Sequence, residues 1–305
     1  MKTTNKALHM SGHIDVEEYI HHSNTRMIMA ALDYEVGRRR VVPIVGPVGA
    51  GKSRLLHEWA NGGSTKFKPH EILLVSIWDP KRSNLKDGTF ATAKAVITFS
   101  QLYGAVSELS RPAVQHHKER TMYWDVQTDA RFASLFREVA GCIKALNIRA
   151  IVIDNSHWID AYTLGRLMEI RGVPVARCGL ILCGQMQQNA TFKEPFEDQF
   201  KAVKTAALAL GEWQILERLT EKEFAGVDDS VLAKIYERVG VEDVTPDVVE
   251  KEELIAKDWW ARTQGDWRRI ARLIEALDRA LSKQKQRVVT QTVIDETNRF
   301  LNGVE

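Results

Sequence analysis

The chain has 305 residues, of which 44% are apolar and 27% are charged, and its formal net charge is +2. This composition is that of an ordinary globular protein with enough chain for one large domain or two modest ones, and we expect no disorder except at the ends. Three cysteines cannot form a disulfide framework. The first residues lack the apolar core of a secretory signal, and no window reaches the roughly 18 consecutive apolar residues of a membrane span. We therefore expect a cytoplasmic protein with no membrane partner.

The first two thirds of the chain alternate between helical and strand-like segments. Apolar residues recur at helical spacing from Val16 to Arg40, and three arginines close this segment. Short continuous apolar runs, typical of buried parallel strands, then predict strands at residues 41–46, 71–78, 148–154 and 178–184, with a weaker fifth at 205–211. Amphipathic patterns predict helices at residues 53–61, 92–109 and 129–146. This alternation predicts an α/β fold with a parallel, doubly wound, five-stranded sheet.

After about Thr220 the strand-like runs stop and helical patterns follow one another to the end of the chain. Several of these patterns begin after residues that commonly cap a helix N-terminus. These residues are Thr220, Thr245, Asp266 and Thr290. The sequence therefore predicts an N-terminal helical segment at residues 1–40, an αβ core at residues 41–220 and an all-helical lid subdomain at residues 221–305.

The sequence GPVGAGKS lies between the first predicted strand and the helix after it, and it satisfies the pattern G-x-x-x-x-G-K-[ST]. In this pattern glycines let backbone N–H groups curl around phosphate oxygens, Lys52 supplies a cation to the β- and γ-phosphates, and the Ser53 hydroxyl is a Mg²⁺ ligand. A strand before the motif and a helix after it are the context that the motif requires. The sequence thus predicts a phosphate-binding loop for ATP and Mg²⁺, formed by Gly46, Pro47, Val48, Gly49, Ala50, Gly51, Lys52 and Ser53.

A magnesium ion at such a loop needs a carboxylate at the end of a nearby strand. Asp154, which ends the run at residues 148–154, is the best candidate, and Asp79 is the alternative. The next residue is Asn155, which can orient a water molecule but cannot take its proton at neutral pH. General-base catalysis is typically worth about 10²–10⁴ in rate, so we expect slow hydrolysis unless another acid such as Asp160 substitutes.

The combination of these motifs resembles the AAA+ ATPases, in which an αβ core with this phosphate loop and strand-end acid precedes a helical lid. Within that superfamily the chain is similar to the target-selection ATPases of transposons, the MuB, TnsC and TniB group. The similarity extends over roughly residues 15–302. It rests on VVPIVGPVGAGKS, AIVIDNSHWID, GLILCGQ, EWQILERLTEKEF, QGDWRRIARLIEAL and VVTQTVIDETNRFL.

The resemblance implies roles for further positions near the nucleotide. Gln185 would be the polar residue after the fourth strand that senses the γ-phosphate. Arg268 would be the lid arginine that reaches the nucleotide, with Arg269 as the alternative. Only one of them can face the phosphates, because adjacent residues point about 100° apart on a helix. Asn155 stands where these enzymes usually have glutamate. The arginine that such proteins offer to a neighbouring subunit has no match after the fourth strand, where the cations are Lys193, Lys201 and Lys204.

The resemblance also implies that the protein assembles with itself, as a ring or helical filament, on duplex DNA when ATP is bound. Contacts to phosphates rather than base edges would make this binding sequence-tolerant and salt-sensitive. Cations between the second and third predicted strands suit this role, namely Lys81, Arg82, Lys86, Arg111, Lys118 and Arg120. The implied function is regulation of DNA transposition, a form of DNA recombination, by target selection and transposase recruitment. A nucleotide-locked scaffold and a replication or helicase loader are the alternatives.

Overall fold

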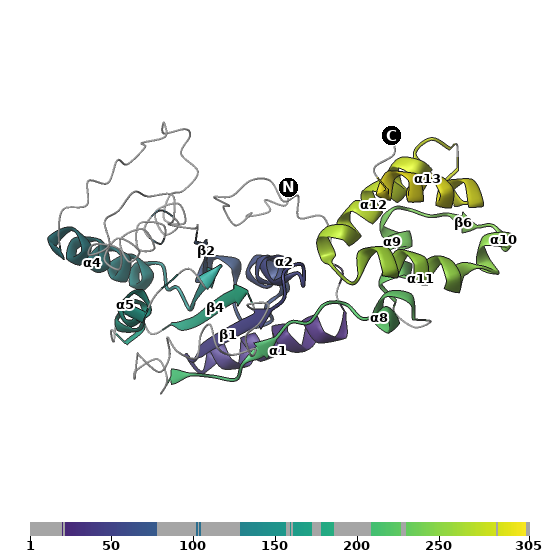
Figure 1. The fold of residues 1–305 in the computed structure, drawn as a ribbon. Coiled ribbons are helices and arrows are strands. Elements are labelled where there is room, and N and C mark those ends of the chain that lie inside the picture. The colour runs from purple at the N-terminus through teal and green to yellow at the C-terminus, as the bar shows by residue number, and fades with distance from the viewer. Residues whose placement is uncertain are drawn as a thin grey trace, which may run out of the picture. The chain divides into compact units, whose positions relative to one another are not determined.

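The computed structural model describes residues 20, 22–77, 102, 104, 129–156, 159, 161–172, 178–185, 209–226, 230–284 and 286–302. Contacts divide the chain into two compact units (Figure 1). Most of the first unit lies in Met27–Gly46 and Lys52–Ile215. The second unit consists of Glu18–Arg26, Pro47–Gly51 and Leu216–Glu305.

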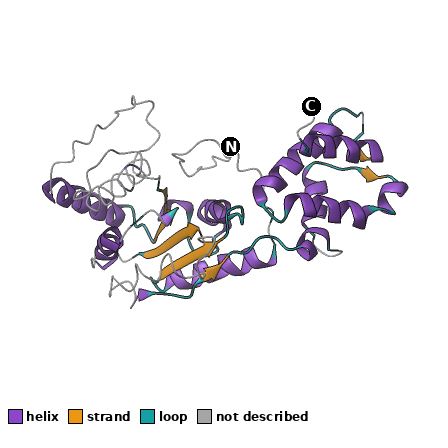
Figure 2. Cartoon of the chain, in the orientation of Figure 1, coloured by secondary structure: helices purple, strands orange, loops and turns teal. Residues whose placement is uncertain are grey.

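A five-stranded parallel sheet forms the centre of the first unit (Figure 2). In spatial order its strands are β2 (Ile72–Ser76), β3 (Ala150–Asp154), β4 (Gly179–Gln185), β1 (Val41–Gly46) and β5 (Gln214–Ile215). The predicted α/β class is confirmed. Because β1 lies beside β4, parallel strands that are far apart in the sequence put their carboxyl ends at the same edge of the sheet.

The position predicted for the fifth strand is wrong. The sequence pattern places that strand at residues 205–211, whereas Gln214 and Ile215 pair with β1. Leu210 makes only an isolated bridge to Val41. The alanine-rich run before Gly211 has little intrinsic preference for strand structure. The apolar pattern therefore predicts a strand a few residues before the one that forms.

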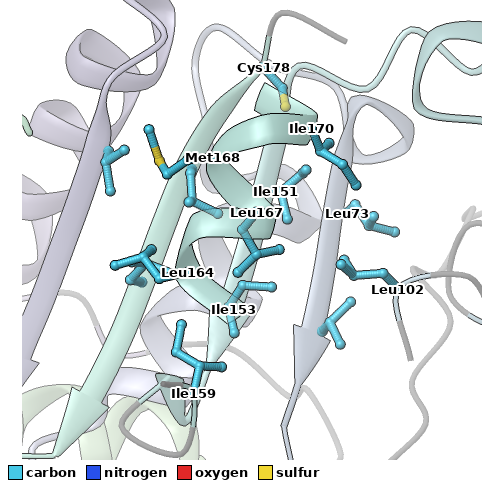
Figure 3. Packing of buried hydrophobic residues seen from close by; sticks show 14 of the residues in the cluster. Leu73, Leu102, Ile151, Ile153, Ile159, Leu164, Leu167, Met168, Ile170 and Cys178 are labelled. Atoms are coloured by element: carbon cyan, nitrogen blue, oxygen red, sulfur yellow. The ribbon is translucent and has the colours of Figure 1, made fainter. Parts of the chain in front are cut away.

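Both faces of the sheet are buried, as expected for a parallel sheet covered by helices. One face packs against α4 (Asp129–Ala145) and α5 (Ala161–Gly172). Figure 3 shows Leu164 and Leu167 of α5 close to Ile151 and Ile153 of β3. The sequence patterns predict α4 but do not predict α5.

The opposite face is next to α1 (Ser23–Gly37) and α2 (Lys52–Glu58). A Cβ atom added to Gly179 at the start of β4 would lie 2.9 Å from Val36 of α1, so the backbones approach closely there. Helix α1 is shorter than the segment predicted from Val16 to Arg40. It ends at Gly37, and the arginines after it form a turn in which Arg39 has a φ of +59°.

A buried carboxylate ties α1 to the segment that leads into β2. Helix α2 continues into the π-helix η1 (Trp59–Gly63), and the short η2 (Pro69–Glu71) precedes β2. Asp33 accepts hydrogen bonds from Trp59 Nε1 at 2.9 Å, Ser64 Oγ at 2.6 Å, and Thr65 N and Oγ1 at 2.8 and 2.7 Å. These four donors satisfy the buried carboxylate and fix the loop after η1.

The second unit is mainly helical. Its helices are α8 (Glu221–Ala225), α9 (Val231–Arg238), α10 (Pro246–Val249), α11 (Glu252–Thr263), α12 (Trp267–Leu281) and α13 (Gln291–Leu301). They enclose an apolar core that includes Phe224, Trp259 and Leu273. The prediction that strands stop after Thr220 is wrong in one detail, because β6 (Asp243–Val244) pairs in parallel with β7 (Val288–Val289).

The predicted helix caps have different outcomes. The side chains of Thr220, Asp266 and Thr290 each accept a backbone N–H of the helix that they precede, which confirms three of the four. Thr245 precedes α10 but makes no such side-chain bond, and its hydroxyl instead donates to the Val289 carbonyl at 3.3 Å. The small β6–β7 sheet competes for this side chain. No helix in the described part of the chain has the length and apolar character to cross a membrane.

Candidate nucleotide site

The GPVGAGKS segment forms a tight loop between β1 and α2. Gly49 and Gly51 have φ angles of +83° and +88°, in the left-handed region that favours glycine. Alternation of left-handed and right-handed residues turns successive backbone N–H groups toward one side, which is the arrangement that binds phosphate oxygens. Gly49 and Gly51 are therefore required by the conformation of the loop, and the residues present fit a nucleotide phosphate group.

Lys52 is the first residue of α2, and its side chain is buried against the loop. Its ammonium group donates to the carbonyl oxygen of Gly46 at 2.8 Å, within a buried environment. Ser53 follows in the first turn of the same helix. A buried ammonium group at the start of a helix favours an anionic ligand there.

Asp154 ends β3, and its buried carboxylate acts on the same thiol as Lys52. Oδ1 of Asp154 accepts the backbone N–H of Asn155 at 2.8 Å. Burial raises the pKa of the Cys183 thiol well above its ordinary value, and the Asp154 carboxylate raises it further while the Lys52 ammonium opposes this rise. Both charges therefore act on one buried side chain of β4, so the loop lysine and the strand-end acid lie in the same small region.

Asn155 has a feature that its side-chain chemistry alone does not indicate. Its φ is +58°, so β3 ends in a left-handed residue. Among residues other than glycine, asparagine and aspartate adopt this conformation at the lowest cost. The next residue, Ser156, is buried, and its hydroxyl donates to the carbonyl of Cys183 at 2.8 Å, which fixes this turn against β4.

The tip of the loop, Pro47–Gly51, belongs by its contacts to the second unit. The Val48 carbonyl accepts hydrogen bonds from Nη2 and Nε of Arg218 at 3.1 and 3.4 Å. The Gly49 carbonyl accepts the backbone N–H of Trp267, the first residue of α12, at 2.9 Å. The carbonyl groups of Val48 and Gly49 are thus both occupied by donors of the second unit.

A further contact shows why Gly49 must be a glycine. A Cβ atom at this position would lie 2.1 Å from Oδ2 of Asp266, the residue that caps α12. Arg218 is also 3.9 Å from this Asp266 oxygen. The sequence predicts Asp266 as a helix cap, but no pattern in it connects Asp266 or Arg218 with the loop. Arg218 lies 170 residues after Val48, so no local pattern could have revealed the contact.

The other residues predicted for the site are placed as follows. Gln185 is the last residue of β4 and pairs in register with Gly46, at the start of the loop. Arg268 is exposed in the first turn of α12, and its backbone N–H donates to Asp266 Oδ1 at 2.8 Å. The alternative, Arg269, is also exposed.

Several predicted residues lie outside the described part of the chain. They are Asp79, Asp160, the predicted DNA contacts Lys81, Arg82, Lys86, Arg111, Lys118 and Arg120, and the cations Lys193, Lys201 and Lys204. The predicted helix at residues 92–109 is outside it as well, apart from residues 102 and 104. The roles assigned to these residues stay predictions.

Comparison with known proteins supports the fold assignment. No protein-family model matches the sequence, and no curated protein matches it. Among solved structures, the chain is similar to the Walker-type ATPase PABY2304 of Pyrococcus abyssi, with a TM-score of 0.52 and 10% sequence identity over 90% of this chain and 71% of that one. The five-stranded parallel sheet with its loop between β1 and α2 is thus the fold of the P-loop NTPases.

Two weaker matches are to PCH-2 of C. elegans and to the Pif1 helicase from Candida albicans. The PCH-2 match has a TM-score of 0.48 and 14% identity over 93% of this chain and 69% of that one. The Pif1 match has a TM-score of 0.39 and 14% identity over 76% of this chain and 47% of that one. Similarity at this level adds nothing to the fold assignment.

Proposed function

We propose that this chain, which has the P-loop NTPase fold, is an ATP-dependent, DNA-binding AAA+ protein that regulates DNA transposition. In this proposal ATP and Mg²⁺ bind at the loop, the protein assembles with itself on duplex DNA, and the assembly selects the target and recruits a transposase. The observation that carries the nucleotide part is the GPVGAGKS loop itself, in which Gly49 and Gly51 are left-handed and Lys52, the first residue of α2, donates to the Gly46 carbonyl at 2.8 Å.

In the proposed site, different residues bind the phosphates and the magnesium ion. Backbone N–H groups of the loop and Lys52 would hold the β- and γ-phosphates, and Ser53 and Asp154 would hold Mg²⁺, the latter through water. The magnesium ion would neutralise charge on the phosphates and orient them. Gln185 and Arg268 are proposed to contact the γ-phosphate, on the basis of the AAA+ resemblance alone.

The DNA part of the proposal rests on the resemblance to the MuB, TnsC and TniB group and on the cations of the segment between β2 and β3. Phosphate contacts from lysine and arginine make binding strongly dependent on salt concentration. We expect the protein to co-sediment with duplex DNA when ATP is present, to lose this association steeply as salt rises, and to lose it in Lys52→Ala.

The control for this experiment is Lys66→Ala, which removes an exposed cation from the first unit outside the loop. We expect it to co-sediment like the wild type. The DNA part is refuted if wild-type protein with ATP does not associate with duplex DNA at low salt. The nucleotide part is refuted if Lys52→Ala binds ATP as tightly as the wild type.

A second candidate function is a nucleotide-locked scaffold, in which ATP drives assembly and turnover is negligible. The observation that favours it is Asn155, which supplies no general base and occupies a left-handed position that disfavours glutamate. Phosphate release from the DNA-bound protein separates the two candidates, since the scaffold would remain assembled without releasing phosphate.

A further inference from the structure

The second unit contains a cavity that the proposed nucleotide site does not use. Its volume is about 310 Å³, which is many times the roughly 30 Å³ that one water molecule occupies in the liquid. It lies where the C-terminal ends of α11 and α13 meet the first turns of α12. Three of the six residues that line it are arginines, and the lining consists of Arg262, Thr263, Arg269, Arg272, Leu301 and Asn302.

One of these arginines is held in place by neighbouring side chains. Nε of Arg262 donates to Asp258 Oδ2 at 2.8 Å, and Nη1 donates to Asn302 Oδ1 at 2.8 Å. These two bonds fix the guanidinium plane and leave its remaining N–H groups for another acceptor. Arg262 therefore forms a positioned wall of the cavity rather than a freely moving surface side chain.

Among the described residues, the other two arginines have few compensating partners. Arg269 and Arg272 are one helical turn apart on α12, so they project from the same face. Nη1 of Arg269 donates to the Arg262 carbonyl at 3.3 Å, which caps the end of α11. Within the described residues neither has an ion-pair partner, and Arg272 makes no hydrogen bond. Three arginines thus line one cavity, and Asp258 is the one acid paired with them in the described part of the chain.

We propose that this cavity is a second anion site, separate from the nucleotide loop, that binds a phosphate group. Guanidinium groups bind phosphate oxygens through paired, charge-assisted hydrogen bonds. A tetrahedral phosphate presents oxygens in several directions and can accept from guanidinium groups on two helices, whereas a planar carboxylate presents two oxygens in one plane. The ligand is either a small free phosphate compound or a backbone phosphate of nucleic acid.

The test uses inorganic pyrophosphate and the full chain carrying Lys52→Ala, which removes the loop lysine. Isothermal titration at low salt should detect pyrophosphate binding in this background. Adding Arg272→Gln should weaken it about tenfold or more, because hydrogen bonds to charged groups are the stronger ones. Arg279→Gln is the matched control, since Arg279 lies two turns further along α12 and its guanidinium rests 4.6 Å from the Phe300 ring centre, outside the cavity.

The proposal is overturned if no pyrophosphate binds, or if Arg272→Gln and Arg279→Gln weaken binding equally, which would indicate general surface charge. Arg269→Gln serves as the second variant if Arg272→Gln lowers the melting temperature. Competition with a short duplex DNA identifies the source: displacement of pyrophosphate indicates backbone phosphates, and retention indicates a small phosphate compound. Because the loop lysine is absent throughout, failure here leaves the proposed nucleotide site untouched.

Discussion

Asn155 has two properties that bear on hydrolysis, one of its side chain and one of its backbone. As a side chain it lacks the basicity of the glutamate that the AAA+ resemblance implies at this position. As a backbone position it is left-handed, with a φ of +58°. A left-handed conformation costs most residues other than glycine roughly 1–2 kcal/mol. The residue type is therefore explained by the turn after β3 as well as by chemistry, and an experiment has to separate the two.

Replacing Asn155 tests whether the missing base limits hydrolysis. We expect Asn155→Glu to release phosphate at least about tenfold faster than Asn155→Gly, because general-base help is typically worth about 10²–10⁴ in rate. Asn155→Gly is the appropriate reference, since it keeps the left-handed turn and has no side chain. Steady-state phosphate release with ATP, Mg²⁺ and DNA measures both.

Two results would contradict this expectation. Brisk phosphate release by the wild type that Asn155→Gly leaves unchanged would mean that another residue activates water. Equal release by Asn155→Glu and Asn155→Gly would mean that a carboxylate from this left-handed position does not reach the attacking water. A thermal melt of each variant shows whether the glutamate disturbs the turn.

At the scale of elements, local patterns predict what depends on neighbours in sequence. The apolar runs that form β1, β2, β3 and β4 are continuous because each strand is buried on both faces, and such runs are recognisable without a structure. The phosphate loop is likewise a contiguous motif. Helix α5 is harder to recognise because Gly165 lies inside it and glycine disfavours a helix interior. The fifth strand is misplaced because two residues at a sheet edge carry little pattern.

What the sequence could not predict depends on distant contacts. The Asp33 network, the Arg218 contact to Val48 and the hydrogen bond from Ser156 to the Cys183 carbonyl each join residues that are far apart in the chain. The arginine cavity is a similar case, because α11, α12 and α13 each contribute or border its lining. Adjacent arginines in the sequence indicate a basic cluster but not a hollow between helices.

The Asp33 network gives a prediction for the element pair α1 and η1. Asp33→Ala should lower the free energy of unfolding by at least about 2 kcal/mol, because it leaves the buried Nε1 of Trp59 without an acceptor and removes the acceptor of three further donors, from Ser64 and Thr65. Urea denaturation followed by tryptophan fluorescence measures the change. Met27→Ala is the control on the same helix, since Met27 is 68% exposed and its loss should change stability by less than about 0.5 kcal/mol.

The expectation fails if Asp33→Ala and Met27→Ala have the same unfolding midpoint. Asp33→Asn provides a further check. Its amide keeps one acceptor oxygen but places an NH₂ group against the donors of Thr65, so its stability should lie between those of the wild type and Asp33→Ala.

At the scale of the whole molecule, buried thiol and phenol groups predict that the free energy of unfolding decreases at alkaline pH. Burial raises the pKa of Cys178 from 9.0 to about 12, and it also raises the pKa values of Cys183 and Tyr236. Between pH 9 and pH 12, the unfolded chain loses the Cys178 thiol proton that the folded chain keeps. The unfolded state then binds fewer protons, so stability is full below pH 9 and falls as pH rises toward 12.

Each buried thiol contributes a loss of about 1.4 kcal/mol per pH unit within that interval. Urea denaturation at neutral pH and about one unit above the ordinary thiol pKa should reveal the decline. Cys178→Ala should show a shallower decline than the wild type, whatever its stability at neutral pH. A stability that stays constant across this interval would show that the thiols ionise equally in both states.

The order of the strands has a consequence for biosynthesis. Strand β1, which leads into the GPVGAGKS loop, pairs with β4 about 140 residues later in the chain. At a synthesis rate of about 5–20 residues per second, the ribosome needs on the order of ten seconds to deliver that partner. During this interval a fully apolar strand has no native neighbour on that side. Efficient production of the protein should therefore depend on chaperones that shield the nascent β1 until β4 has emerged.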